Sequence, residues 1–402
     1  MTIQEKNAPA RVENPVIEVG TYQESLYQSV QSHHGEGPVF VVRKPLAVER
    51  GWWQGMVSPI SVVVIAVLLM VALFSFGLGA SLTSHPNSMN SPPSSSNSSS
   101  STDMSNTSSA PTTNVPNATQ EYGNQLATYV VDPGGAKHFT FTAEQVMWEV
   151  VKGQRVLAWT INGTVPGPMI RVRAGDHVRV TFINHFPKPT AIHWHGLLVP
   201  EAQDGVPGLG QKPVLPRQTH LYDFTVSDQD VGTHWYHSHY DDLEQVAGGF
   251  YGAFMVDPRP GTPQAKQAIK ADVEYTEFIA TMPGGWYVIN GKSFPDTQPI
   301  LVKHGQTVHV RLIGADTMMI HPMHLHGHTF SLVAEGGHLL SQPTQMDTLL
   351  VAPGGTYDIT FSAWAAPGSI YPFHCHILSH LMNPGQTGEE MGGLITLIKY
   401  AK

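Results

Sequence analysis

The chain has 402 residues, 41% of them hydrophobic and 13% charged, and its formal net charge of −9 comes without a long basic run, which excludes nucleic acid as an expected partner. Abundant glycine (38) and proline (31) favour short strands joined by turns. The single cysteine, Cys375, excludes a disulfide within the chain. Histidine stands out, because its 22 residues equal the lysines and arginines together.

The N-terminal part is expected to lie at a membrane. Residues 1–55 show no clear periodicity, whereas residues 56–82 carry no charge and are long enough to cross a bilayer as a helix. Basic residues precede this segment and none follows until Lys137, so the positive-inside rule places residues 1–55 in the cytoplasm and the rest outside. The length of the preceding region favours a retained anchor over a cleaved signal peptide.

The remaining chain is expected to form a linker and two β domains. Residues 83–121 are rich in Ser, Asn, Thr and Pro, which is typical of a disordered linker. A repeat then begins at Ile161-Asn-Gly and again at Ile289-Asn-Gly, and each copy leads through two predicted strands to clusters of histidine. The sequence therefore predicts two similar domains, 122–260 and 261–402, each the size of one β-sandwich.

Four His-x-His pairs lie in matching places of the two repeats. Residues i and i+2 of a strand point to one face, so each pair presents two imidazoles to one place. Imidazole binds copper, zinc, iron and nickel. One such pair is usually structural, but four of them predict a multinuclear metal site, and structural zinc fits less well because closed zinc sites favour several cysteines. The pairs are His193/His195, His237/His239, His324/His326 and His374/His376.

A second metal site is expected beside the first. Cys375 lies between the two histidines of the last pair and so faces away from them, and His321 has the opposite parity from His324. His321, Cys375 and His380 therefore form a separate set of two nitrogens and one thiolate. Two His and one Cys with a weak axial thioether form the blue-copper electron-transfer site. Because adjacent Cα atoms lie about 3.8 Å apart, Cys375 would link the two sites by a short, largely through-bond route.

These motifs resemble those of the multicopper oxidase (laccase-like) family over about residues 125–402. The patterns His-Trp-His-Gly, Tyr-His-Ser-His, His-Pro-Met-His-Leu-His-Gly and His-Cys-His-x-x-x-His all match. The resemblance implies an all-β fold of two tandem cupredoxin-like Greek-key β-sandwiches, after the predicted membrane helix and linker. It also implies four coppers per subunit: one type 1, one type 2 and a type 3 pair.

The resemblance assigns ligands by position. It implies His321, Cys375 and His380 for the type 1 copper, with Cys375 as the electron-transfer residue, and His193 and His324 for the type 2 copper. The remaining six histidines fall to the type 3 pair: His195, His237, His239, His326, His374 and His376.

The resemblance also implies a role for Asp204, which lies in Gln-Asp-Gly after His-Trp-His-Gly. It matches an acidic position that the family uses to deliver protons to oxygen intermediates. Without the resemblance, a turn residue before Gly205 is an equally good interpretation.

The chain departs from the family pattern after the last type 1 histidine. Many relatives have the axial residue five positions later, where this chain has Gly385. Residues 381–390 look like an insertion, so Met391, just before the last predicted strand, is the axial candidate and Met382 the alternative. Because the axial ligand tunes the potential, the redox potential stays open. Some relatives have a second acidic proton donor directly after the last type 1 histidine, and this chain has Leu381 at that position.

The subunit arrangement is predicted by analogy. Aligning the repeats places Ser238 at the position of Cys375, so domain 1 lacks a type 1 site of its own. The likeness is closest to the two-domain class, in which domain 1 of one subunit and domain 2 of the next build the trinuclear cluster of a homotrimer. The ligands here divide four and four, and we predict a homotrimer.

The resemblance implies an oxidase that takes single electrons from a reducing substrate and reduces O₂ to water. Phenols, Cu(I), Fe(II) and Mn(II) all stay open as substrates. A copper nitrite reductase is the enzymatic alternative, but it needs only a mononuclear three-histidine site and usually keeps its blue site in the first domain. A copper-binding or electron-carrier protein is the non-enzymatic alternative, and it has no need of eight further imidazoles.

Several methionines lie near the type 1 ligands in sequence. They would suit Cu(I), although filling gaps in a core is the more usual role of methionine. These residues are Met318, Met319, Met323 and Met346.

Overall fold

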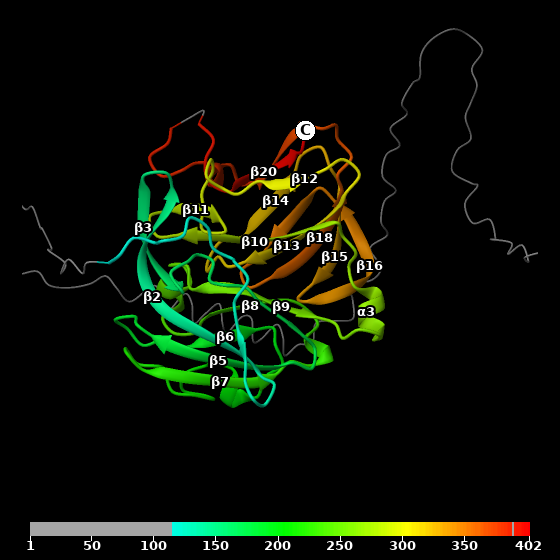
Figure 1. The fold of residues 1–402 in the computed structure, drawn as a ribbon. Coiled ribbons are helices and arrows are strands. Elements are labelled where there is room, and N and C mark those ends of the chain that lie inside the picture. Colours follow the sequence, from blue (N-terminus) through cyan, green and yellow to red (C-terminus); the bar gives the residue numbers. More distant parts are fainter. Residues whose placement is uncertain (1–114, 388–389) are drawn as a thin grey trace, which may run out of the picture. The chain divides into compact units, whose positions relative to one another are not determined.

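The computed structural model of the protein describes residues 115–387 and 390–402 (Figure 1). The regular structure of these residues is almost entirely β, with short helices such as α2 (Asp242–Gln245) and α3 (Pro263–Gln267), so the all-β prediction is confirmed for them. None of their helices has the length and apolar character needed to cross a membrane. The predicted cytoplasmic segment, the membrane helix 56–82 and the linker up to residue 114 lie outside the described residues.

Domain 1 is a pair of sheets, shown in cyan and green in Figure 1. One sheet has the order β1-β2-β5-β7, and β3 also pairs with β2. The other sheet has the order β4-β9-β8-β6. Strict alternation in β5 turns Val178, Val180 and Phe182 into the core between the sheets. The strands are β1 (Val130–Val131), β2 (Lys137–Val151), β3 (Gln154–Ile161), β4 (Ile170–Arg173), β5 (His177–Asn184), β6 (Ile192–His195), β7 (Thr219–Thr225), β8 (Gly232–Ser238) and β9 (Tyr251–Asp257).

Domain 2 repeats this plan in yellow to red (Figure 1). Its sheets have the orders β11-β10-β13-β18-β15-β16 and β12-β20-β19-β14-β17. The strands are β10 (Val273–Met282), β11 (Trp286–Ile289), β12 (Ile300–Val302), β13 (Thr307–Gly314), β14 (His321–Leu325), β15 (Phe330–Glu335), β16 (His338–Met346), β17 (Thr348–Val351), β18 (Thr356–Ser362), β19 (Ile370–Cys375) and β20 (Ile395–Tyr400).

The two domains match strand by strand where the histidines lie. In domain 1, β4 is parallel to β9, and β9, β8 and β6 follow in antiparallel order. In domain 2, β12 is parallel to β20, and β20, β19 and β14 follow in the same way. The β6/β8 pair therefore corresponds to the β14/β19 pair, and every His-x-His motif starts on one of these four strands.

A third apolar core joins the domains. Trp148 and Trp235 of domain 1 and Phe278 and Ile313 of domain 2 belong to it, and the indole N–H of Trp148 donates to the carbonyl of Gly291 at 2.7 Å. Because this contact is apolar and continuous, the two sandwiches form one body.

Pro116 and Ala118, in the last part of the predicted linker 83–121, pair with β2. The carbonyl of Pro116 accepts from Met147 N–H at 2.8 Å, and Ala118 N–H donates to Met147 O at 3.1 Å. The polar composition of this stretch does not predict the pairing, because the pairing depends on main-chain groups alone.

Asp358 links the two domains through one buried hydrogen bond and pairs with a buried histidine of its own domain. Its Oδ1 accepts from the Thr233 hydroxyl at 2.9 Å and lies 2.7 Å from His309 Nε2, and all three side chains are buried. Asp358→Ala leaves both partners buried without an acceptor, a loss of about 3–5 kcal/mol. We expect Tm to fall by roughly 6–20 °C in calorimetry.

Asp228→Ala is the matched control, because Asp228 pairs with Arg259 where both side chains are partly exposed. Loss of such a surface pair costs about 0–1 kcal/mol. Equal, small shifts for both variants would show that the Asp358 carboxylate does not hold the domains together.

Candidate metal centres

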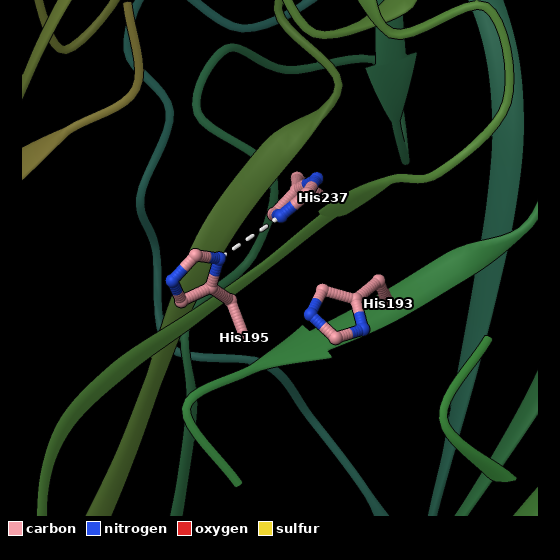
Figure 2. A group of neighbouring side chains, drawn as sticks. All are labelled: His193, His195 and His237. Atoms are coloured by element: carbon pink, nitrogen blue, oxygen red, sulfur yellow. Dashed lines mark hydrogen bonds between the residues drawn. The ribbon is translucent and has the colours of Figure 1, made fainter. Parts of the chain in front are cut away.

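The domain 1 histidines meet at the ends of β6 and β8. Register pairs His193 with His237, and alternation buries Trp194 while His193 and His195 face outward. Figure 2 shows His193, His195 and His237 turned toward one another, with His195 Nδ1 3.2 Å from His237 Nε2. The ring of His239 lies 5.5 Å from that of His193, so all four predicted imidazoles gather in one place.

The domain 2 histidines form the same arrangement on β14 and β19. Register pairs His324 with His374, and the Nε2 atoms of His326 and His374 lie 2.8 Å apart. The ring of His376 lies 5.7 Å from that of His324. We name the two sets the domain 1 group (His193, His195, His237, His239) and the domain 2 group (His324, His326, His374, His376).

Main-chain carbonyls orient half of these imidazoles. An Nδ1–H that donates to a carbonyl fixes the tautomer and leaves the Nε2 lone pair free for a metal. The same two positions are held in this way in each group, which makes the groups equivalent in chemistry as well as in sequence. The bonds run from His193 to Asp204 O (2.8 Å), His324 to Asp347 O (2.9 Å), His237 to Ser238 O (2.7 Å) and His374 to Cys375 O (2.7 Å).

Burial keeps several of these imidazoles neutral. It lowers the pKa of His195 to about 4, with a further contribution from His193 and His234. Burial also lowers the pKa of His237 to about 3, and the pKa of His374 in the same direction. Neutral imidazole is the form that binds metals, so the donor set fits the copper that the sequence implies.

The predicted type 1 residues come together in the core of domain 2. Nδ1 of His321 lies 3.2 Å from Nδ1 of His380, and Cys375 Sγ lies 4.0 and 3.6 Å from these two atoms. His321, Cys375 and His380 are 1%, 0% and 4% exposed. Ligand bonds of about 2.0–2.3 Å around one ion place donor atoms roughly 3.3–3.8 Å apart, so the three donors fit a single copper.

Strand parity explains why the type 1 set and the domain 2 group lie on opposite faces of the same strands. His321, Met323 and Leu325 face the core from β14, whereas His324 faces outward, as the sequence predicts. Across the sheet Cys375 pairs with Met323 and is buried too, while its neighbour His374 faces outward.

Two residues beside the type 1 set were missed by sequence reasoning. Asp316 Oδ2 lies 3.1 Å from His321 Nε2, and Tyr287 stacks on His380 with ring centroids 4.1 Å apart. Burial raises the pKa of Asp316, but hydrogen bonds from His321, Thr281 and two backbone N–H groups outweigh it and lower that pKa to about 2. Neither residue belongs to a histidine motif, and Tyr287 is far from His321 and His380 in sequence.

The two axial candidates differ from the three ligands in burial. Met391 is 63% exposed and Met382 is 37% exposed. The structure therefore encloses His321, Cys375 and His380 together, while both thioethers stay at least partly at the surface.

The place in domain 1 that corresponds to the type 1 set holds a hydrogen-bonded polar cluster. Ser238 occupies the Cys375 position, and Thr190 precedes His193 by the same three residues that separate His321 from His324. The hydroxyls of Ser238 and Thr190 each donate to Gln245 Oε1 at 2.7 Å. All three are fully buried, so their polar groups satisfy one another.

Asp204 lies beside a histidine of the domain 1 group. Its carboxylate Oδ1 is 3.3 Å from His193 Nδ1. The same nitrogen donates a hydrogen bond to the main-chain carbonyl of Asp204. Its side chain is partly exposed, so it reaches both the domain 1 group and solvent.

The two histidine groups make no hydrogen bond or ring contact with each other in the described part of the chain. Within residues 115–387 and 390–402, the hydrogen bonds and ring contacts among the eight histidines all stay inside one group. Each group therefore offers four imidazoles at its own place.

Comparisons with known proteins agree with this geometry. Multicopper oxidase family profiles match residues 140–261 and 257–384. A crystal structure of a blue copper oxidase from Nitrosomonas europaea has 32% sequence identity and a TM-score of 0.59, and the match covers 65% of this chain and 85% of that one.

Curated relatives include copper resistance protein A of Pseudomonas syringae pv. tomato, 25% identical over 55% of this chain and 45% of that protein. Laccase-14 of Oryza sativa subsp. japonica is 29% identical over 63% of this chain and 48% of that protein. The chain thus spans about half the length of these curated relatives. With two matching family profiles and the histidine and cysteine sets in place, the chain belongs to the multicopper oxidase family.

Proposed function

We propose that this protein couples one-electron oxidation of a reducing substrate, a phenol or a metal ion, to the four-electron reduction of O₂ to water. One observation carries the proposal: the buried set of His321, Cys375 and His380 adjoins the domain 2 group through a single residue, Cys375. An electron that enters at one set therefore has a covalent route to the other.

The residues of this chain would hold and orient the metal ions and provide a path for electrons. Copper, when bound, supplies the one-electron redox chemistry. Burial of the type 1 set and the stacked ring of Tyr287 keep water away from it. The Cys375 carbonyl accepts from His374 Nδ1–H at 2.7 Å, which adds a hydrogen-bonded path to the route along the backbone.

Asp204 is proposed as the proton source for O₂ reduction. Support comes from its carboxylate, 3.3 Å from His193 Nδ1, and from its partial exposure, which lets it exchange protons with solvent. Met391 stays the proposed axial ligand, although its exposure shows that its thioether would have to turn inward.

We propose four coppers per subunit, shared within a homotrimer. The type 2 copper would use His193 and His324, and the type 3 pair the other six histidines of the two groups. Each group supplies only half of such a set, and the two groups share no hydrogen bond or ring contact in the described chain, which supports a cluster built between domain 1 of one subunit and domain 2 of the next.

We also propose that residues 56–82 anchor the protein, with the catalytic domains outside the cytoplasm. The support is the uncharged apolar run and the basic residues that precede it.

The two alternatives are less favoured. A nitrite reductase or an electron carrier leaves most of the eight imidazoles without a role, and the comparisons match multicopper oxidases and laccases.

Copper content tests the proposal directly. The full chain is purified in detergent and examined by metal analysis, visible absorption, EPR and O₂ uptake. We expect about four coppers per chain, a blue thiolate band, a type 2 EPR signal and O₂ uptake with a phenol. One or two coppers per chain without O₂ uptake would contradict the oxidase and favour a carrier or a nitrite reductase.

A further inference from the structure

A cavity of about 730 Å³ lies between the two domains. Domain 1 contributes the start of β8 and the end of β9, and domain 2 contributes one face of the sheet that contains β13 and β18. The segment that links the domains and carries α3 forms a third wall. None of the proposed copper ligands lines this cavity, so the chemistry proposed above leaves it without a role.

Apolar side chains form much of the cavity wall, and they come from both domains and from the linking segment. Cavities of this size with apolar walls and a few polar groups are the usual binding sites of small organic molecules, and they occur preferentially at domain interfaces. The main apolar lining residues are Leu198, Val231, Met255, Pro258, Ile269 and Leu339.

Strand β13 places two polar side chains at the floor of the cavity. Alternation turns Val308 and Val310 into the core of domain 2, so His309 and Arg311 lie on the opposite face. His309 is 1% exposed, and its Nε2 lies 2.7 Å from Asp358 Oδ1. Its Nδ1 is buried without a hydrogen-bond partner in the described part of the chain. Buried polar atoms are rarely left in this state, which points to a ligand that supplies the missing partner.

The charged side chains around the cavity are already paired with one another. Arg311 donates through Nη1 to Glu274 at 3.0 Å, and its Nε lies 3.5 Å from Asp358 Oδ1. Arg171 donates to Glu274 at 3.1 Å and makes two hydrogen bonds to Asp257. An ion that entered the cavity would leave water without gaining an unpaired counter-charge, so the site favours an uncharged ligand. Among the described residues these contacts leave Nη2 of Arg311 without a partner.

We propose that this cavity binds an uncharged, largely apolar organic molecule that carries a hydroxyl group. Because the Asp358 carboxylate accepts at Nε2, the neutral ring of His309 carries its hydrogen there and offers the Nδ1 lone pair. The hydroxyl donates to this lone pair and accepts from Nη2 of Arg311, while the rest of the molecule contacts the apolar walls. Side-chain rotamers at a binding site commonly adjust to the ligand, and such an adjustment is needed to uncover Nδ1.

The test uses the copper-loaded full chain in lipid nanodiscs, under argon, with three naphthalene probes in equilibrium dialysis against empty nanodiscs. The probe 2-naphthalenemethanol carries the hydroxyl, 2-ethylnaphthalene has a methyl group in its place, and 2-naphthoate is an anion of similar size. We expect one saturable site per chain for the alcohol. The ethyl probe should bind about tenfold more weakly or worse, because it can neither donate nor accept, and the anion should also bind at least about tenfold more weakly.

Ala268→Trp is expected to abolish saturable binding, because its indole enters the cavity from the linking segment. Ala265→Trp is the matched control, since it makes the same exchange in α3 at a position that does not line the cavity. His309→Phe keeps an aromatic ring but removes Nδ1, and it should weaken the alcohol to the level of the ethyl probe. The two-probe comparison on the wild type tests the same hydrogen bonds without any change to the protein.

Equal binding of the alcohol and the ethyl probe to the wild type would overturn the proposal, because the polar floor would then play no part. The absence of a saturable site, or a site that survives in Ala268→Trp, would overturn it as well. Tighter binding of 2-naphthoate than of the alcohol would show that the cavity selects an anion. Every readout is binding rather than O₂ uptake, so the result is independent of the proposed oxidase function.

Discussion

Cys375→Ser is expected to remove the blue absorption band and to lower turnover with every reducing substrate by at least about a thousandfold. The hydroxyl that replaces Sγ is neither a thiolate nor a soft ligand, so the set of His321 and His380 loses its third donor. The same exchange breaks the route by which an electron leaves for His374. Stopped-flow spectroscopy and O₂ uptake on the full-length variant measure both effects.

The histidine groups provide the internal control for this variant. The imidazoles that lie on the strands face outward, whereas the Cys375 side chain is buried in the core, so we expect copper content to fall by about one per chain and the type 2 EPR signal to remain. A variant that keeps its blue band would show that Cys375 is not a type 1 ligand. A variant that loses the band but keeps its turnover would show that electrons enter the cluster by another route.

The metal sets were predictable because they depend on strand periodicity. A period of two alone separates His321 from His324 and Cys375 from His374, and the structure shows this alternation in β14 and β19. The repeat adds to this, because it aligns Ser238 of domain 1 with Cys375 of domain 2.

The residues around these sets were not predictable in the same way. Tyr287 reaches His380 from β11, and Asp316 reaches His321 from the loop before β14, so both contacts depend on how distant strands meet. Exposure is also a property of the folded chain. Sequence alone favoured core filling for Met318 and Met319, and the loop that carries them turns both to solvent. Core filling does describe Met323, which is buried.

Two inactive variants are expected to restore activity to each other when they assemble together. His195→Ala/His237→Ala disables the domain 1 group, and His326→Ala/His374→Ala disables the domain 2 group. Either variant alone lacks two imidazoles of every cluster and should show no O₂ uptake above background. Co-expressed in equal amounts, they form mixed trimers if the cluster lies between subunits.

The expected recovery follows from random assembly. Each interface receives an intact domain 1 with a chance of about one half and an intact domain 2 with the same chance, so about a quarter of the wild-type activity returns. The chain that supplies the intact domain 2 also supplies its own Cys375, so electrons still reach the restored cluster.

A cluster built within one chain gives a different result, because no chain in the mixture then carries both groups and activity stays at background. Co-expression of wild type with the domain 1 variant is the control for subunit expression and for interference by an inactive chain. It should retain about half of the activity in either arrangement, since half of the domain 1 groups are intact and all domain 2 groups are. Complementation by the paired variants is therefore the result that separates the two arrangements. We expect it because the two groups, with four imidazoles each, share no hydrogen bond or ring contact in the described chain.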